Sequence, residues 1–345
     1  MPLPKRTLGQ DGPSVPAIGL GLGSLGGFYG PAGTLDEKVG VLERAHSAGV
    51  RFWDTADVYA DSEEVIGEWV RRAASGNNTT TGKDSSSTTG NGSKREDVFL
   101  ATKFALQRQP DGRHSFRSDP EYVMAACENS LRRLGVDCID LLYCHRVDGV
   151  TPIEKTVEAM VELKKQGKIR HLGLSEVSAS TLRRAHAAHP ISALQMEYSL
   201  FTLDIESPGS GILQTCRELG VTVVAYSPVG RGVLTGRFQS HADIPAGDLR
   251  RMLPKYSEEN FPQVMQLVRG LEDAASAHGC TPAQVALAWL LAQGPDIVPI
   301  PGTKSGAKVD ENAAAARIRL SEEEVQEIRA LAERVDIKGT RYPAA

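Results

Sequence analysis

The chain has 345 residues, of which 41% are hydrophobic, and this is enough apolar material for one large core. Its 39 basic and 43 acidic residues are mixed along the sequence and leave a formal charge of −4, which argues against a nucleic-acid partner. The sequence contains no run of about 18 apolar residues that would predict a membrane span, and its first residues, MPLPKRTLGQDG, lack a signal-peptide core. Five scattered cysteines without a C-x-x-C pair predict a reduced, cytoplasmic protein with no zinc site.

The predicted elements begin with a short hairpin over residues 5–19, whose turn lies at Gln10-Asp11-Gly12. Eight short apolar runs follow, and each is typical of a buried strand. They start at Ala17, Arg51, Val98, Ile139, Ile169, Ala193, Val221 and Asp296. Segments with helical period lie between the runs, among them residues 34–50, 119–135, 151–168 and 178–189.

Several predicted helices carry start or stop signals. Thr151-Pro152-Ile153-Glu154 combines a capping-box pattern with a proline at the first helical position, and Thr281-Pro282-Ala283-Gln284 repeats it. Gly135 is a stop signal shortly before the strand that starts at Ile139. Residues 321–345 predict a helix with an acidic start, followed by a short tail. Arg341 and Tyr342 in this tail are expected to belong to a frayed end, and the alternative is that they help to frame a ligand pocket.

Residues 73–95 read AASGNNTTTGKDSSSTTGNGSKR and contain no apolar side chain beyond two alanines. Such a segment cannot bury enough surface to offset the entropy of ordering it. We therefore predict a flexible surface insertion over this range.

Eight buried strands that alternate with helices predict a single (β/α)8 barrel domain over residues 1–345. A doubly wound open sheet is the alternative, because periodicity alone does not distinguish a closed sheet from an open one. Residues 21–26, GLGSLG, match the G-x-G-x-x-G pattern of dinucleotide-binding folds. The residues that follow predict a loop instead of a helix. We therefore interpret this stretch as the first strand-to-helix loop, whose glycines let another group approach the backbone closely.

In a (β/α)8 barrel, functional side chains lie where the strands end. The polar residues at these points are Asp54, Tyr59, Lys103, His145, Ser175, Glu176, Gln195, Tyr226 and Ser227. The first four each have a purely structural alternative: a turn cap, a rim aromatic, a surface charge and a buried core imidazole. Their occurrence at successive strand ends favours one catalytic cluster.

The chemistry of these four residue types is coherent. A tyrosine hydroxyl has a pKa of about 10, and a nearby ammonium such as that of Lys103 lowers this pKa. Asp54 would supply the counter-charge of the lysine, and His145 could orient a carbonyl oxygen. Such a set protonates an alkoxide but supplies no electrons, so a hydride donor is required.

Seven segments together resemble the aldo-keto reductase superfamily, from about Arg6 to Arg334. They are FWDTADVYADSEEVIG, VFLATKF, LLYCHRVD, IRHLGLSEVS, LQMEYSLF, VVAYSPVGRGVLTGRF and PIPGTKSGAKVDEN. Within the superfamily, the chain is most similar to the branch of pyridoxal reductases and auxin-induced-type proteins.

The resemblance implies an NADPH-dependent carbonyl reductase. Tyr59 would be the acid, Lys103 and Asp54 would tune it, and His145 would orient the carbonyl group. The implied cofactor-binding residues are Gly23, Ser24, Leu25, Ser175, Gln195, Tyr226, Ser227, Pro228, Val229, Gly230, Arg231, Gly232, Gly236, Ile300, Gly302, Thr303, Lys304, Lys308, Glu311 and Asn312. The implied liners of the substrate pocket are Leu25, Phe28, Tyr29, Phe104 and Arg146.

Two residues depart from the pattern of many relatives. Glu176 stands where asparagine is common, and Lys308 stands where arginine is common. Arginine binds a 2′-phosphate with two parallel hydrogen bonds and lysine with one charge, but Lys304 and Lys308 together still favour NADPH over NADH.

Two other functions remain open at this stage. The chain could be an NADPH-binding sensor of reductase-like fold that regulates a protein partner, although such a sensor would not need Tyr59 or Lys103. It could also be a lyase that forms an imine at Lys103, but imine chemistry needs a neutral lysine and Asp54 would keep the lysine charged. The expected substrate is a small carbonyl compound; the sequence predicts no oligomeric state.

Overall fold

The chain folds around one parallel sheet of eight strands, as seen in a computed structural model that describes residues 2–27, 32–75, 94–109, 113–335 and 337. Neighbours in the sheet follow one another in sequence order, and every pairing is parallel. The strands are β3 (Leu20–Gly21), β4 (Phe52–Asp54), β5 (Phe99–Phe104), β8 (Ile139–Cys144), β9 (Ile169–Ser175), β10 (Ala193–Glu197), β11 (Thr222–Tyr226) and β12 (Ile297–Pro299).

The first and last strands meet, so the sheet is a closed barrel. Gly19 N–H donates to the carbonyl of Pro299 at 3.0 Å, and Gly21 N–H donates to that of Pro301 at 3.3 Å. A β-carbon on Gly21 would lie 2.7 Å from the carbonyl oxygen of Ile300, so glycine permits this close approach. Closure confirms the predicted (β/α)8 barrel and excludes the open-sheet alternative.

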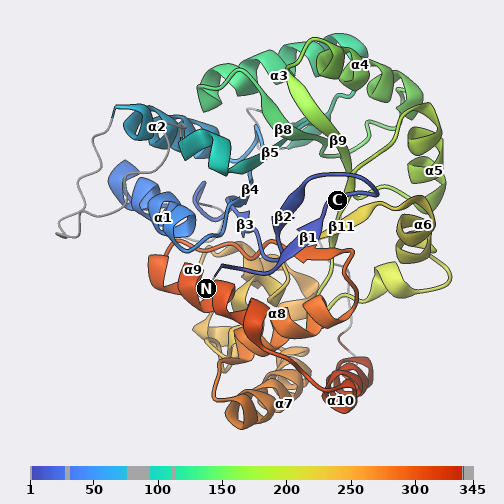
Figure 1. Cartoon of the computed structure of the whole chain (residues 1–345). Helices are drawn as coiled ribbons and strands as arrows, with labels where there is room; N and C mark the ends of the chain where they lie inside the picture. Colours follow the sequence, from blue (N-terminus) through green and yellow to red (C-terminus); the bar gives the residue numbers. More distant parts are fainter. Residues whose placement is uncertain (1, 28–31, 76–93, 110–112, 336, 338–345) are drawn as a thin grey trace.

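Helices surround the barrel, as Figure 1 shows. Consecutive helices contact each other from α1 to α6 and from α7 to α9, and α9 returns to α1. Within the part of the chain that the structure describes, no helix combines the length and apolar character needed to traverse a lipid bilayer. The helices are α1 (Leu35–Ser47), α2 (Ser62–Ala74), α3 (Pro120–Leu134), α4 (Ile153–Lys165), α5 (Ala179–Ala188), α6 (Ile212–Leu219), α7 (Phe261–His278), α8 (Pro282–Ala292), α9 (Gly306–Ala314) and α10 (Glu322–Arg334).

The helix signals in the sequence gave one wrong prediction. Thr281 and Gln284 form the predicted capping box of α8, and Gly135 ends α3 with the left-handed φ of 63°. Thr151 does not cap α4, because the helix begins one residue later, at Ile153, and Thr151 instead donates its hydroxyl to Asp148 at 2.8 Å. The carboxylate of Asp148, three residues upstream, was the competing partner.

The predicted hairpin closes one end of the barrel. Strands β1 (Lys5–Thr7) and β2 (Ser14–Pro16) pair antiparallel, and Figure 1 shows them across the end of the barrel that faces the viewer. Leu8 and Val15 pack onto the apolar side chains that fill the interior, while Arg6 donates to the carbonyls of Gly294 and Leu291 at 2.6 Å. The hairpin therefore covers the end of the barrel opposite to the strand ends that carry the predicted site residues.

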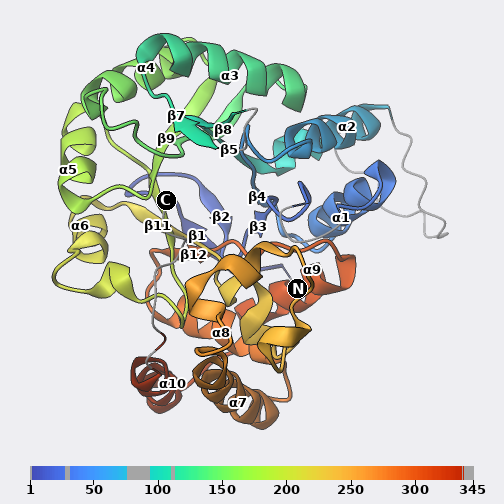
Figure 2. The same ribbon diagram turned by 180° about the vertical axis from the view of Figure 1, so that it is seen from behind.

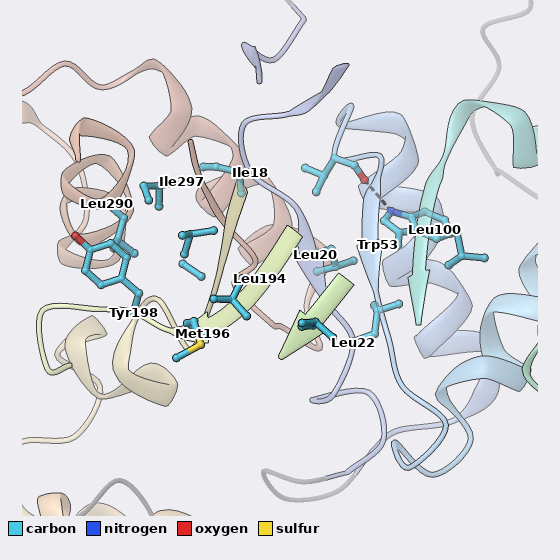
Figure 3. Packing of buried hydrophobic residues seen from close by; sticks show 14 of the residues in the cluster. Ile18, Leu20, Leu22, Trp53, Leu100, Leu194, Met196, Tyr198, Leu290 and Ile297 are labelled. Atoms are coloured by element: carbon cyan, nitrogen blue, oxygen red, sulfur yellow. Dashed lines mark hydrogen bonds between the residues drawn. The ribbon is translucent and has the colours of Figure 1, made fainter. Parts of the chain in front are cut away.

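A second apolar layer lies between the strands and the helices. Figure 3 shows part of it, with Leu20, Leu22, Trp53, Leu100 and Leu194 among the labelled side chains. The indole N–H of Trp53 donates to the carbonyl of Val50 at 2.7 Å, so this buried polar group is satisfied. Alternate residues of each strand thus face the interior and the helices, which fixes the register of the polar residues at the strand ends.

The predicted insertion over residues 73–95 is too long at both ends. Ala73 and Ala74 complete α2, because alanine favours a helix, and residues 94–97 form the short helix η1 (Lys94–Asp97). Lys94 pairs with Glu43 at 2.8 Å and Arg95 with Asp140 at 2.8 Å, so these two cations are held by partners outside the segment. The central residues of the insertion, 76–93, lie outside the described residues.

Two features had not been predicted. A small hairpin, β6 (Leu106–Arg108) with β7 (His114–Phe116), follows β5 at the open end of the barrel. A series of short 3-10 helices follows β11, and Figure 2 shows this gold segment beside α8. They are η3 (Gly230–Thr235), η4 (His241–Asp243), η5 (Leu249–Met252) and η6 (Pro254–Tyr256). The remaining short helices are η2 (Asp204–Glu206) and η7 (Ala315–Arg317).

Candidate active site

The predicted Asp–Lys pair lies at the open end of the barrel. Asp54 ends β4, and Lys103 is the penultimate residue of the neighbouring β5; both side chains are fully buried. Lys103 Nζ donates to Asp54 Oδ1 and, at 2.6 Å, to the carbonyl of Thr55. Gln195 Nε2 donates to the other oxygen of Asp54 at 2.7 Å. Every partner of this carboxylate donates to it, so its charge is well satisfied.

Burial and charge act in opposite directions on this pair. Burial raises the pKa of Asp54, and the Lys103 ammonium opposes that shift. Burial alone would lower the pKa of Lys103, but the Asp54 carboxylate and the Tyr59 phenol outweigh it and raise the pKa. Lys103 is therefore an ammonium at neutral pH, and this argues against imine formation at this residue.

Tyr59 and His145 lie beside the pair. Lys103 Nζ is 4.9 Å from the centroid of the Tyr59 ring, and the rings of Tyr59 and His145 meet edge to face at 5.8 Å. The structure thus brings together all four residues predicted as catalytic. The glycine-rich loop makes room for this arrangement at Gly26, because a β-carbon there would lie 2.6 Å from the Tyr59 carbonyl oxygen.

The end of β9 holds Ser175 and Glu176. Ser175 is paired in register with Gln195, and its hydroxyl accepts a hydrogen bond from Arg146 at 3.1 Å. Glu176 has a left-handed φ of 53°, and its carboxylate accepts from the backbone N–H of Glu197 at 3.0 Å. The side chain that departs from the family pattern is thus engaged with the backbone of the next strand.

A pocket of about 320 Å³ extends from Asp54, Tyr59 and Gln195 towards α9. It is lined by sixteen of the predicted cofactor residues: Gly23, Ser24, Gln195, Tyr226, Ser227, Pro228, Val229, Arg231, Gly232, Ile300, Gly302, Thr303, Lys304, Lys308, Glu311 and Asn312. The other four do not line it within the described part of the chain: Leu25 is buried in the apolar core, Gly230 packs against Phe201, and Ser175 and Gly236 lie outside its walls.

Six residues of the pocket wall had not been predicted: Gly21, Leu22, Thr235, Arg237, Arg250 and Ala283. Thr235 and Arg237 lie in the segment VVAYSPVGRGVLTGRF, which already pointed to the cofactor. Arg250 carries no motif of its own and reaches the pocket only because η5 folds back towards η3, where its Nη1 donates to the Arg231 carbonyl at 2.9 Å.

Cations gather at the end of the pocket that is remote from Tyr59. Burial and the nearby charges of Arg250 and Arg237 lower the pKa of Lys304. Asp248 pairs with Arg250 at 2.6 Å, and Glu311 pairs with Lys308 at 2.6 Å. Four cations, Lys304, Lys308, Arg237 and Arg250, therefore line this end of the pocket, and this concentration of positive charge favours an anionic ligand.

The structure describes three of the five residues that were predicted to line the substrate pocket. Phe28 and Tyr29 lie outside the described residues. Leu25 and Phe104 are buried in the core between strands and helices, so neither offers a side chain to a ligand. Arg146 is half-buried at the end of β8 and remains a candidate.

Comparison with known proteins gives the family. The sequence profile described as the Aldo/keto reductase family matches residues 17–333. The chain belongs to the aldo/keto reductase family. As an aldo/keto reductase it is an oxidoreductase, and the strand ends that carry Asp54 and Lys103 lie within the matched residues.

Two relatives match almost the full chain. It is 52% identical over 344 residues to Aldo-keto reductase str7 of Strobilurus tenacellus, with 99% of this chain and 95% of that protein covered. It is 44% identical over 346 residues to Aldo-keto reductase yakc [NADP(+)] of Schizosaccharomyces pombe, with the same coverage of 99% and 95%.

Solved aldo/keto reductase structures share the fold. The thermostable aldo-keto reductase Tm1743, solved with the inhibitor epalrestat, has a TM-score of 0.72 at 30% identity and covers 95% of this chain and 100% of its own. The glycerol dehydrogenase AKR11B4 of Gluconobacter oxydans has a TM-score of 0.81 at 27% identity and covers 97% of each chain.

Proposed function

We propose that this aldo/keto reductase uses NADPH to reduce an aldehyde or ketone to an alcohol by hydride transfer. The observation that carries the proposal is the position of Lys103 Nζ, which is buried against Asp54 and lies 4.9 Å from the ring centroid of Tyr59. Asp54 and Tyr59 line a pocket whose far end is cationic, as a phosphate-bearing cofactor requires. The relative named with NADP(+) supports the same cofactor.

In this proposal Tyr59 donates a proton to the carbonyl oxygen as the alkoxide forms. The ammonium of Lys103 stabilises the phenolate that the proton leaves behind, since the two groups are neighbours. Asp54 keeps Lys103 charged, as its fully buried ion pair with the lysine indicates. His145, whose ring meets that of Tyr59, hydrogen-bonds the same carbonyl oxygen and orients it.

The residues of the pocket fit NADPH. Ser24 Oγ is buried in its wall without a hydrogen-bond partner among the described residues, which is expected of a group that serves a ligand. Gln195 uses its amide N–H on Asp54, which leaves its oxygen to accept from the nicotinamide carboxamide. Lys304, Arg237 and Arg250 would hold the phosphates. Bound NADPH would supply the hydride, the one reactant that the side chains cannot provide.

The remaining assignments extend the same proposal. Tyr226 would stack on the nicotinamide ring, and residues 227–236 would cover the pyrophosphate, with Ser175 as a second carboxamide ligand. Glu176 is not assigned to the cofactor, because its carboxylate binds the backbone of Glu197. Pyridoxal and aromatic aldehydes are the first substrates to examine, since motifs of the sequence resemble those of the pyridoxal reductase branch. We place the reaction in the cytoplasm, where five free cysteines are stable.

The test follows NADPH consumption with pyridoxal and an aromatic aldehyde for the wild type, Tyr59→Phe and Tyr143→Phe. Tyr143 is the matched control, because its ring centroid also lies near Lys103 Nζ, at 5.8 Å, and its buried hydroxyl has no partner among the described residues. Loss of a general acid lowers kcat by about 100-fold to 10,000-fold, and we expect this for Tyr59→Phe alone.

Fluorescence titration of NADPH separates binding from chemistry. Unchanged NADPH affinity in Tyr59→Phe, together with the loss of turnover, supports the acid role. Equal losses in both tyrosine variants would contradict it. A wild-type protein that binds NADPH but reduces no member of a broad carbonyl panel would instead favour an NADPH-binding sensor, and capture of a protein partner would then be the next experiment.

A further inference from the structure

Arg146 is the first residue after His145 at the open end of the barrel, and its guanidinium is held in place. Its Nη1 donates to the carbonyl of His145 at 2.6 Å and to the hydroxyl of Ser175 at 3.1 Å. The side chain is half-buried, so it has lost part of its hydration. Two hydrogen bonds from one nitrogen thus fix a charged group between the ends of β8 and β9.

The other edge of this guanidinium is unused. Neither Nε nor Nη2 of Arg146 makes a hydrogen bond to the described residues, and no described carboxylate forms an ion pair with it. Elsewhere in the chain the same edge binds carboxylates: Arg184 Nε and Nη2 donate to both oxygens of Glu154 at 2.8 and 2.7 Å. Arg117 binds Asp119 through the same two nitrogens at 2.8 and 3.1 Å. The Nε/Nη2 edge of Arg146 has the planar two-donor geometry that a carboxylate matches.

The place of this edge suggests what binds it. Ser175 is paired in register with Gln195, which lines the proposed cofactor pocket. His145 contacts the ring of Tyr59, the proposed proton donor. Arg146 therefore adjoins both the nicotinamide end of the pocket and the carbonyl position. The nicotinamide group carries no anionic substituent, so an anion bound here would belong to the substrate.

We propose that Arg146 binds a carboxylate on the substrate, so that the enzyme prefers aldehydes or ketones that carry a carboxylate in addition to the carbonyl group. This inference rests on the proposed reductase function and adds the substrate class to it. A half-buried cation without a carboxylate partner is costly in the free enzyme, and a carboxylate on the substrate removes this cost. Neutral carbonyl compounds leave the cation unpaired and are bound less well.

The test compares para-carboxybenzaldehyde with its methyl ester, which keeps the aldehyde and ring but removes the charge. Wild-type enzyme is expected to prefer the acid in kcat/KM by about 10-fold to 100-fold, mainly through KM, as a charge-assisted pair allows. Arg146→Gln is expected to abolish this preference, so that the acid and the ester are reduced with similar kcat/KM. Arg146→Lys keeps the charge without the two-donor edge, so it should retain only part of the preference.

Two controls distinguish direct binding from an effect on neighbouring groups. Arg184→Gln removes an exposed arginine that already has a carboxylate partner, and it should leave the acid-to-ester ratio unchanged. The NADPH dissociation constant should be the same for wild type and Arg146→Gln. A large change in that constant would show that Arg146 acts through Ser175 and the cofactor, and would overturn the proposal.

The outcomes for the two hypotheses differ. Reduction of acid and ester with equal kcat/KM by the wild type leaves the reductase function intact and overturns the role of Arg146. If neither compound is reduced, calorimetric titration of para-carboxybenzaldehyde into enzyme with NADP⁺ decides the question: binding to wild type but not to Arg146→Gln supports the carboxylate site without the reaction, and absence of binding to either overturns it.

Discussion

The two ends of the proposed cofactor pocket treat charge in opposite ways. At the Tyr59 end, Lys103 and Asp54 are buried together and Gln195 completes the hydrogen bonds of the carboxylate. At the far end, Lys304 lies among Arg237 and Arg250, and burial and these neighbours lower its pKa. The first end is complete without a ligand, as a preorganised catalytic site should be. The second end gathers positive charge, so in our proposal it contributes affinity for the anionic cofactor and the choice between NADPH and NADH.

The largest expected effect comes from removing the Lys103 cation at the Tyr59 end of the pocket. Lys103→Met leaves the buried carboxylate of Asp54 without its cation, and we expect the free energy of unfolding to fall by about 3–5 kcal/mol. Urea denaturation at pH 8 measures this change. The double variant with Asp54→Asn is the control and should recover most of the loss, because it also removes the unpaired charge. A single variant as stable as the wild type would mean that the pair contributes nothing to stability.

Removing a cation from the far end of the pocket should change the affinity for NADPH and leave the stability of the fold nearly unchanged. Lys304→Met is expected to raise the dissociation constant of NADPH by about 10-fold to 100-fold, with little change for NADH, because only NADPH carries the additional phosphate. Fluorescence titration with both cofactors measures the ratio. Lys308→Met is the matched control: both lysines are exposed, but Lys308 is held by its ion pair with Glu311, so its loss should cost no more than about fivefold. Equal losses in the two variants would show that the proximity to Arg237 and Arg250 is irrelevant.

Asp57, which follows β4 but does not line the cofactor pocket, contrasts with the fully paired Asp54. Asp57 Oδ1 is buried without a hydrogen-bond partner among the described residues, and burial, reinforced by Glu63, raises the pKa of Asp57 to about 7. A raised carboxyl pKa means that the folded state holds a proton that the unfolded state releases above about pH 4. This group therefore stabilises the fold at low pH, and its contribution is lost as the pH rises through about 7.

Asp57→Asn removes this pH dependence and gives the smallest of the expected effects. Between pH 5.5 and pH 8.5 the wild type should lose roughly 2 kcal/mol relative to the variant, so the variant gains in relative stability as the pH rises. Urea denaturation of both proteins across this range measures the difference. A constant difference at all pH values would show that Asp57 has an ordinary pKa in the folded protein.

Much of the site could be predicted because strand ends carry its residues. Asp54, Lys103, His145 and Gln195 were found by listing the polar residues where apolar runs stop, and the barrel geometry alone brings such residues together. The glycine-rich stretch GLGSLG was correctly separated from a dinucleotide-binding helix start, because its glycines accommodate Tyr59 and the first–last strand contact.

Other features depended on partners distant in sequence. Arg250 reaches the pocket only through the fold of the segment after β11, which has no strong helical period. Thr151 fails as a cap because Asp148 competes for its hydroxyl, although its local pattern matches that of Thr281. Lys94 and Arg95 belong by composition to the polar insertion, but Glu43 and Asp140 hold them. The local sequence pattern gives no information on which hydrogen-bond or ion-pair partner will be chosen when several compete.

The sequence by itself determined the eight strands, most of the helices between them and the residue types at the strand ends, since these follow from hydrophobic period and local capping chemistry. The tertiary structure decided which charges are satisfied. It paired Lys103 with Asp54, turned Glu176 to the backbone of Glu197 and left one edge of Arg146 unused. The reason is physical: a charge is stabilised or left available by the groups that surround it in space, and most of those groups come from other strands and helices.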